Sequence, residues 1–450
     1  MKKTGWIAVL AIAGVAVAVG GAYALPYWFA TKQTAKVDIR DAALIARGAE
    51  VARQGDCIAC HTAPGGKPFA GGLAMQTPVG AIYSTNITPD PVHGIGQYDY
   101  GDFERAVRQG VRRDGTPLYP AMPYVSYAIV KDEDIKALYA WFMTQVPAVA
   151  QDNHAATIPW PMNMRWPLAW WQYLFAGQRR FEPSPHLDAQ QQRGAYLVEG
   201  LAHCGACHTP RGIAYQEKAL KDEAGGAYLS GSVLEGWYAK NLRNEAAGLA
   251  SWPQADIADF LKTGRTASTA AFGSMADVVE HSTQHMSDAD LQAIAAYLKA
   301  LAPRPGHPAA FKAGADVTTA RLLKGDYAAP GALAYVENCA SCHGLDGQGA
   351  PRIFPALAGN TIVRAEDASS LIQVTLAGSA MAKTPADRMR LEMPGFDQLD
   401  NRTVADIVSF IRSGWGNGAT VVSAKDVAEM RAIVARKPAN YVPISREGAK

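Results

Sequence analysis

The distribution of apolar and polar positions first sets apart the N-terminus of the chain. Lys2 and Lys3 precede residues 4–31, which carry no charge, and residues 6–25 are apolar throughout. Basic residues before an apolar run are typical of an export signal, and about 20 apolar residues can also span a bilayer. The sequence therefore predicts a signal peptide or membrane anchor over residues 1–30. Ala22-Tyr23-Ala24 resembles a cleavage site, but the run exceeds the roughly 7–15 apolar residues of a signal peptide, which favours a retained helix.

Beyond residue 40, the chain carries a helical pattern that recurs three times. Each repeat opens with a Gly-Ala pair, at residues 48, 194 and 331, that begins a short amphipathic helix. Each repeat ends with another helix, expected over residues 131–146, 287–301 and 400–413, with Asp-rich start signals in the first two. Aligning these helices places Trp141, Tyr297 and Phe410 at equivalent positions. An aromatic ring there could pack over the glycine of the first helix, although ordinary core packing explains the same pattern.

The middle of each repeat also matches the others. An Asn (Asn86, Asn241, Asn360) is followed by a helix-like stretch closed by Gly (Gly110, Gly264, Gly378) and then by a loop with a Met. A loop Asn could bind a propionate group or form a backbone turn, and the turn is the commoner role.

Length and composition fit this repeat. At roughly 100–200 residues per domain, 450 residues predict about three domains. The net charge of +2 excludes a strongly basic nucleic-acid-binding protein and an acidic disordered tail. We predict an all-α fold of three tandem domains after the N-terminal helix. The expected boundaries are 1–30 for the signal or anchor, 40–150 for domain 1, 151–185 for an aromatic-rich linker, 186–302 for domain 2, 303–329 for a linker, 330–418 for domain 3 and 419–450 for a polar tail.

The domain type follows from the 6 cysteines, which form three Cys-x-x-Cys-His motifs and leave no cysteine over. They are Cys57, Cys60 and His61; Cys204, Cys207 and His208; and Cys339, Cys342 and His343. This motif is the attachment signature of c-type haem, in which two thiols add to the haem vinyl groups and the histidine ligates the iron. The sequence therefore predicts three covalently bound haem c groups, one in each of three tandem class I cytochrome c domains.

A Cys-x-x-Cys pair also occurs in redox-active sites and in zinc sites. A redox-active pair does not need a histidine at the same place three times. A zinc ribbon usually places its two pairs about 15–20 residues apart, far closer than here. In bacteria such haem is attached outside the cytoplasmic membrane, so we expect the domains at its periplasmic face.

The sixth iron ligand is expected to be a Met, because a thioether favours ferrous iron and raises the potential. The chain has 12 Met residues. Position in the repeat, after the closing Gly and before the last helix, selects Met122, Met275 and Met393. Both Met122 and Met393 precede a Pro, which stiffens a ligand loop. In domain 2 the rivals are Met286, His281 and His285, and lesser competitors elsewhere are Met75, Met381 and Met389.

With these motifs in place, the chain resembles the tri-haem cytochrome c subunit of bacterial membrane-bound dehydrogenases, of the alcohol, gluconate, sorbitol, fructose and aldehyde dehydrogenase type. The resemblance runs from about residue 44 to about residue 418. The segments that carry it are 82–91 (IYSTNITPDP), 115–124 (GTPLYPAMPY), 158–168 (IPWPMNMRWPL), 229–243 (LSGSVLEGWYAKNLR) and 413–417 (SGWGN).

The resemblance implies a non-catalytic electron-transfer subunit of an oxidoreductase complex. It would take electrons from a large dehydrogenase subunit with a PQQ, FAD or molybdenum cofactor, with or without a small subunit, and deliver them to ubiquinone in the membrane. In this family each haem iron is ligated by one His and one Met. The matching residues here are His61, His208 and His343 with Met122, Met275 and Met393. Two alternatives stay open: a conduit to a terminal oxidase without a dedicated dehydrogenase, and a haem peroxidase.

The linker between domains 1 and 2 is the last distinctive segment. Residues 158–181 are rich in large aromatic residues, among them Trp160, Trp166, Trp170, Trp171, Tyr173 and Phe175. Packing between domains is the simpler explanation, and a surface facing a membrane or a partner is the functional one.

Overall fold

The computed structural model describes residues 2–29, 35–77, 79–177, 179–222, 225–307, 314 and 316–436. The chain forms two compact units: residues 1–182 with 199–203, and residues 183–198 with 204–450. The predicted domain 1 lies in unit 1, and most of domain 2 and all of domain 3 lie in unit 2. The predicted domain boundaries stay a prediction.

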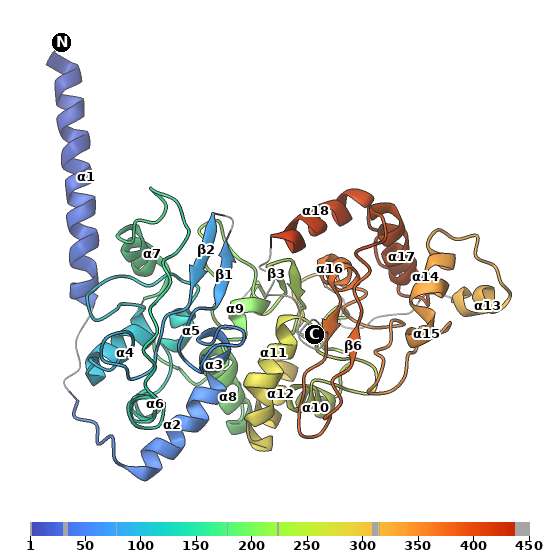
Figure 1. The fold of residues 1–450 in the computed structure, drawn as a ribbon, viewed down its shortest axis with the longest axis horizontal. Coiled ribbons are helices and arrows are strands. Elements are labelled where there is room, and N and C mark those ends of the chain that lie inside the picture. The colour runs from blue at the N-terminus through green and yellow to red at the C-terminus, as the bar shows by residue number, and fades with distance from the viewer. Residues whose placement is uncertain are drawn as a thin grey trace. The chain divides into compact units, whose positions relative to one another are not determined.

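Unit 1 contains the N-terminal helix and a small helical domain with one hairpin (Figure 1). Its elements are α1 (Lys2–Phe29), α2 (Ala42–Gln54), α3 (Cys57–Cys60), β1 (Ala74–Thr77), β2 (Gly80–Tyr83), α4 (Tyr100–Gln109), α5 (Tyr124–Tyr127), α6 (Asp132–Thr144) and α7 (Pro167–Phe175). Residues 5–25 of α1 have a mean hydropathy of 2.2 and make α1 the one described helix that is long and apolar enough to cross a membrane.

Unit 2 contains the other two repeats. Its first part is α8 (Ala189–Tyr196), the π-helix η1 (Leu197–Leu201, shared with unit 1), α9 (Gly205–His208), β3 (Ser232–Leu234), β4 (Trp237–Ala239), α10 (Gln254–Thr263), α11 (Ser274–His281), η2 (Thr283–His285) and α12 (Asp288–Ala300). Its second part is α13 (Thr318–Leu323), α14 (Ala332–Asn338), α15 (Ala340–His343), α16 (Ser369–Ala377), β5 (Ser379–Ala380), β6 (Glu392–Met393), α17 (Asn401–Ser413) and α18 (Ala424–Ala435).

The fold is mainly helical, as predicted, but three small antiparallel hairpins accompany the helices. They pair β1 with β2, β3 with β4, and β5 with β6. No strand is longer than four residues among those described, so alternation of apolar and polar side chains could not reveal them.

In each repeat, the first and last helices cross at the glycine of the Gly-Ala pair. Gly48 and Gly194 lie within α2 and α8 and do not begin them as expected, whereas Gly331 directly precedes α14. A Cβ atom on Gly48 would lie 2.1 Å from the backbone oxygen of Ala137 and 2.6 Å from the Cβ atom of Trp141. At Gly194 the corresponding distances are 2.0 Å, to the oxygen of Ala293, and 2.7 Å, to Cβ of Tyr297. The absence of a side chain therefore lets backbone pack on backbone, beside the aromatic residue that the alignment singled out.

The third crossing follows the same rule with a different neighbour. A Cβ atom on Gly331 would lie 2.1 Å from the backbone oxygen of Asp406, one helical turn before Phe410. The Phe410 ring instead packs against Tyr335 of α14, with 5.4 Å between ring centroids. The small residue is thus needed in all three crossings, while the aromatic contact varies.

The closing glycines also have their predicted role. Gly110, Gly264 and Gly378 follow α4, α10 and α16 with φ values of 66°, 75° and 70°. Glycine occupies this left-handed region without the steric cost of a side chain, which is why it ends so many helices.

The predicted polar tail contains one ordered helix. Val427 and Met430 of α18 are buried in the core formed around Tyr335, Val404 and Phe410. Residues 419–436 therefore complete the core of domain 3 rather than lying loosely on it, and residues 437–450 lie outside the described residues.

The crossing of α8 and α12 can be tested by adding one methyl group. Gly194→Ala would place its Cβ atom 2.0 Å from the Ala293 oxygen, so the helices must move apart. We expect the free energy of unfolding to fall by about 1–3 kcal/mol, measured by urea unfolding followed by circular dichroism. Gln190→Ala, at an exposed position of the same helix, is the matched control. Equal stability of the two variants would contradict this account of the crossing.

Candidate functional site

The three Cys-x-x-Cys-His motifs each lie on a single helical turn that follows the first helix of a repeat. These turns are α3, α9 and α15. Asp56 and His203, just before the first cysteine of domains 1 and 2, adopt left-handed φ values of 51° and 37°. This conformation ends the preceding helix and redirects the chain into the motif. In domain 3 a one-residue break at Cys339 does the same without a positive φ.

Each motif histidine is oriented by a hydrogen bond to a backbone carbonyl. The ring Nδ1 atom lies within hydrogen-bond distance of a loop oxygen, which as a carbonyl can only accept. Nδ1 therefore carries the proton, and the lone pair of Nε2 is left for a metal. The pairs are His61 with Thr85 at 2.7 Å, His208 with Lys240 at 2.7 Å and His343 with Pro355 at 2.9 Å.

Burial favours the neutral form of these rings. Removal from water lowers the pKa of His61 and of His343 below the usual value, and it lowers the pKa of His208 to about 4. A neutral imidazole is the form that ligates iron, so the histidines are prepared for this role by their surroundings.

The cysteine environments fit a thioether better than a thiolate. Burial raises the pKa of Cys57, Cys204 and Cys339 to about 12 in each case. A site that disfavours the negative thiolate suits the uncharged sulfur of a haem thioether, whereas zinc requires thiolates. No group of three or more His, Cys, Asp or Glu side chains that would hold a metal ion occurs in the described part of the chain.

The repeated asparagines hold the loops that supply the carbonyls. The side-chain oxygen of Asn86, Asn241 and Asn360 accepts the backbone N–H two residues later in each case, at 2.9, 2.7 and 3.1 Å. The turn reading is therefore confirmed. In domains 1 and 2 the acceptor carbonyl belongs to the residue directly before this Asn, so the turn fixes the oxygen that orients the histidine.

These carbonyls were missed by sequence reasoning, because every residue has one. Their position in the repeat could have identified two of them, because Thr85 and Lys240 each directly precede the repeated Asn. In domain 3 the carbonyl that accepts from His343 belongs to Pro355. The side chain of Asn360 donates to the oxygen of Ala356, which directly follows Pro355, at 2.9 Å.

The structure places the predicted methionines in three different settings. Met122 lies in a turn just before α5, and its carbonyl accepts from Tyr124 N–H at 2.9 Å. Met393 lies on β6 opposite Ser379. Met275 lies in the first turn of α11, not in a loop, and packs against a small cluster that includes Ala271 and Val279. All three side chains are half-buried.

The rivals in domain 2 differ in burial. Met286 is only 2% exposed, whereas the side chains of His281 and His285 are exposed. The assignment of the sixth ligands, Met275 included, stays a prediction.

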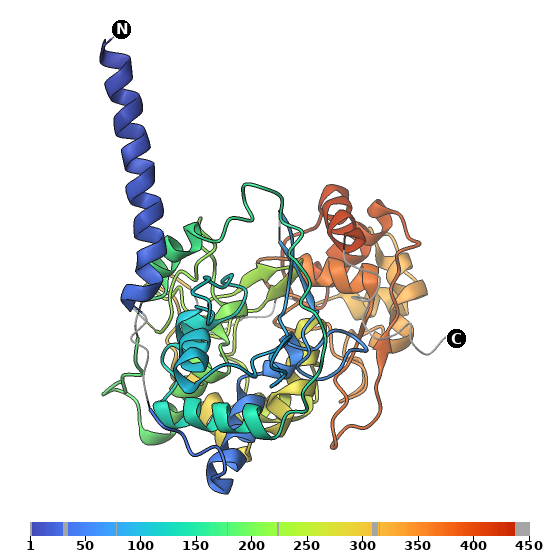
Figure 2. The same ribbon diagram turned by 60° about the vertical axis from the view of Figure 1, so that its left-hand side comes forward.

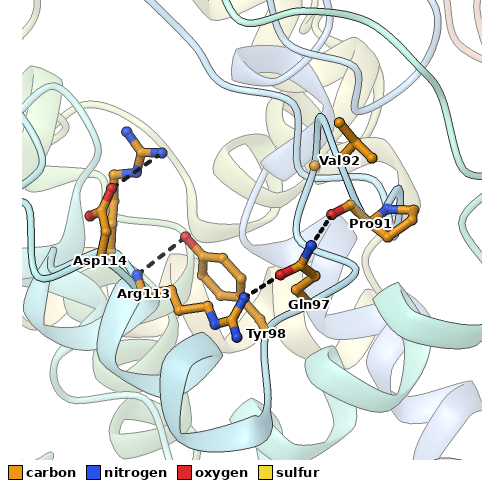
Figure 3. Close-up of a pocket in the computed structure, with 8 residues that line it drawn as sticks. Pro91, Val92, Gln97, Tyr98, Arg113 and Asp114 are labelled. Atoms are coloured by element: carbon orange, nitrogen blue, oxygen red, sulfur yellow. Dashed lines mark hydrogen bonds and ion pairs between the residues drawn. The ribbon is translucent and has the colours of Figure 1, made fainter.

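A cavity of about 400 Å³ in unit 1 lies away from the motifs. Figure 3 shows Gln97 between Pro91 and Arg113 on its wall: Gln97 donates to the Pro91 oxygen at 2.7 Å and accepts from Arg113 at 2.6 Å. The cavity contains no cysteine or histidine in its lining, so it offers no site for haem attachment. The residues that line it are Pro91, Val92, Gly94, Gln97, Tyr98, Arg112, Arg113 and Asp114.

Comparison with known proteins identifies the repeats. The cytochrome c family model matches three times, at residues 45–145, 191–302 and 328–415. The chain belongs to the cytochrome c family. Each matched segment of this cytochrome contains one motif and its oriented histidine, and cytochrome c domains carry covalently bound haem c.

Relatives of the cytochrome extend over most of its length. It is 51% identical to the gluconate 2-dehydrogenase cytochrome c subunit of Pantoea cypripedii, over 86% of this chain and 90% of that one. It is 47% identical to the cytochrome c subunit of the quinone alcohol dehydrogenase of Gluconobacter oxydans, over 95% and 88%. The fructose dehydrogenase cytochrome subunit of Gluconobacter japonicus is 37% identical, over 86% and 82%. The predicted resemblance is thereby confirmed.

Attachment of a haem to each motif can be tested by mass. Replacing Cys204 and Cys207 together by Ala removes both thioether bonds of one site, so the chain should carry one haem fewer. Intact-mass spectrometry of the purified protein measures this directly. Ser341→Ala is the control: Ser341 is exposed and lies between the cysteines of another motif, so this variant should retain the full haem mass. An unchanged mass of the double variant would refute attachment at this motif.

The sixth ligand of domain 2 can be tested with a pair of matched substitutions. Met275→Leu removes a thioether with little change in volume, so one haem should lose its methionine-to-iron absorption and its potential should fall. Met286→Leu should leave the spectrum unchanged. The opposite pair of results would assign the ligand to Met286.

Proposed function

We propose that this cytochrome is the tri-haem electron-transfer subunit of a membrane-bound dehydrogenase complex at the periplasmic face of the bacterial cytoplasmic membrane. It takes electrons from a large dehydrogenase subunit and passes them to ubiquinone. It would contribute no substrate chemistry of its own. The relatives named as cytochrome subunits of gluconate, alcohol and fructose dehydrogenases support this role.

The observation that carries this proposal is the same histidine geometry in all three matched segments. Each has two cysteines for covalent attachment and a neutral imidazole whose Nδ1 is held by a carbonyl. Three sites of this kind in one chain provide a series of electron carriers rather than a single reactive centre. When bound, each haem iron exchanges one electron between its ferric and ferrous forms.

The chain's own residues have separate tasks in this function. The cysteines would hold each haem covalently, and His61, His208 and His343 would ligate its iron through Nε2. Met122, Met275 and Met393 would close the other side, which leaves no open position for peroxide. If all three irons are closed in this way, none of them can bind peroxide, and the chain would conduct electrons without reacting with a substrate at iron.

The partner and the acceptor can be tested together on the native complex. We expect purification from the membrane under mild conditions to yield a large subunit with a flavin, quinone or molybdenum cofactor. Adding that subunit's substrate should reduce all the haems, and a soluble ubiquinone analogue should then reoxidise them, as followed by absorption. Repeated purification without a large subunit would favour the oxidase conduit. Rapid peroxide turnover by one haem would instead favour the peroxidase.

A further inference from the structure

Helix α7 in the aromatic linker presents an apolar face that stays largely exposed. Trp170, Tyr173 and Leu174 are exposed, Leu174 at 66%, and their i, i+3, i+4 spacing puts them on one side of the helix. Ala169 and Ala176, which flank this face, are buried, and Gln172 lies on the opposite side of the helix and bonds to Gly110. The turn before the helix adds Trp160, which is 78% exposed, and Met162, which is half exposed at 52%.

The same helix packs against the end of the apolar helix α1. The indole Nε1 of Trp170 donates to the backbone oxygen of Ala18 at 3.2 Å. A Cβ atom on Gly21 would lie 3.3 Å from the Trp170 ring, so the glycine makes room for the indole. Figures 1 and 2 show α7 beside the C-terminal part of α1 in both views.

The position of this contact along α1 gives the depth of α7. Only 6% of the apolar segment Gly5–Leu25 is buried, so apart from the end that packs on α7 its surface is exposed and suits a bilayer core. Ala18 lies seven residues before its end, which at 1.5 Å per residue is about 10 Å. Amphipathic helices that lie in a membrane interface bury their apolar face by about 5–10 Å, which is the same depth.

The inner face of the linker is fixed to the loop that leads to Met122. Gln172 donates to the oxygen of Gly110 at 2.8 Å. Arg165 donates to the oxygen of Pro117 at 2.9 Å and stacks over the Tyr119 ring, 3.7 Å from its centroid. Because Arg165 is engaged inside the unit, its role is to hold the linker to domain 1 and not to meet lipid headgroups.

We propose that residues 160–174 form an interfacial docking surface that inserts into the outer leaflet beside a retained α1. The occupant is lipid, because the surface adjoins the membrane-spanning helix at the matching depth and carries the Trp and Tyr side chains that suit an interface. The inference rests on the proposed membrane location of the cytochrome, but not on its electron-transfer partners. It assigns domain 1 a second membrane attachment that sets its orientation.

The test uses the full-length haem-loaded cytochrome in vesicles of phosphatidylethanolamine and phosphatidylglycerol. A phospholipid with a diazirine in its upper acyl chain is photoactivated, and labelled peptides are mapped by mass spectrometry. We expect label both in α1 and in residues 160–174. The double variant Y173Q/L174Q should lose label in residues 160–174 several-fold while α1 stays labelled.

Two controls make the result decisive. Val92→Gln changes another exposed apolar side chain of unit 1, at 78% exposure, and should leave both signals unchanged. Matching haem absorption of all variants shows that they fold. Label in α1 alone, equal label in the double variant, or a mature chain that begins after Ala24 would each overturn the proposal. Since no dehydrogenase is present, these outcomes are independent of whether the proposed electron transfer holds.

Discussion

The hydrogen bond between each motif histidine and a loop carbonyl is the constraint around which the cytochrome is organised. It determines which ring nitrogen keeps its proton, and so which one can face iron. The bond requires that a loop far along the chain return to the cysteine motif at hydrogen-bond distance. From Cys57 to Thr85 and from Cys204 to Lys240, the intervening chain includes a hairpin, and an Asn turn then fixes the carbonyl.

The helices provide the frame that makes this return possible. In all three repeats, the helix before the motif crosses the last helix of the same repeat at a glycine, with backbone against backbone. In domains 1 and 2 the residue before that glycine strengthens the crossing. Arg47 and Arg193 pair with Asp134 and Asp290 at 2.6 and 2.8 Å. The third crossing has Pro330 at this position and depends instead on the aromatic core around Tyr335.

Sequence reasoning succeeded where chemistry restricts the residue type. Only glycine suits the left-handed helix ends at Gly110, Gly264 and Gly378, so those helix boundaries could be predicted. The last helices, predicted at 131–146, 287–301 and 400–413, agree with α6, α12 and α17 to within two residues. The carbonyl partners of the histidines could not be predicted, because a backbone oxygen leaves no mark on the sequence. The helix α18 was missed because its few buried side chains, such as Val427 and Met430, are spaced among charged ones. Met275 was expected in a loop because the repeat suggested one, and local helix formation after Gly273 prevailed.

The packing of domains 2 and 3 within one unit has a kinetic consequence. Tyr238 N–H donates to Ser370, Ala356 N–H donates to the Ser268 oxygen, and Gly273 N–H donates to Ser379, at 2.8 to 2.9 Å. Lys240 contributes to both domains: its oxygen orients His208, and its amine donates to Thr361 at 2.7 Å. These bonds hold the second and third motifs in one arrangement. Haems bound at the two motifs would therefore keep a separation that is set when the chain folds. Electron tunnelling between such haems would not have to wait for one domain to diffuse toward the other.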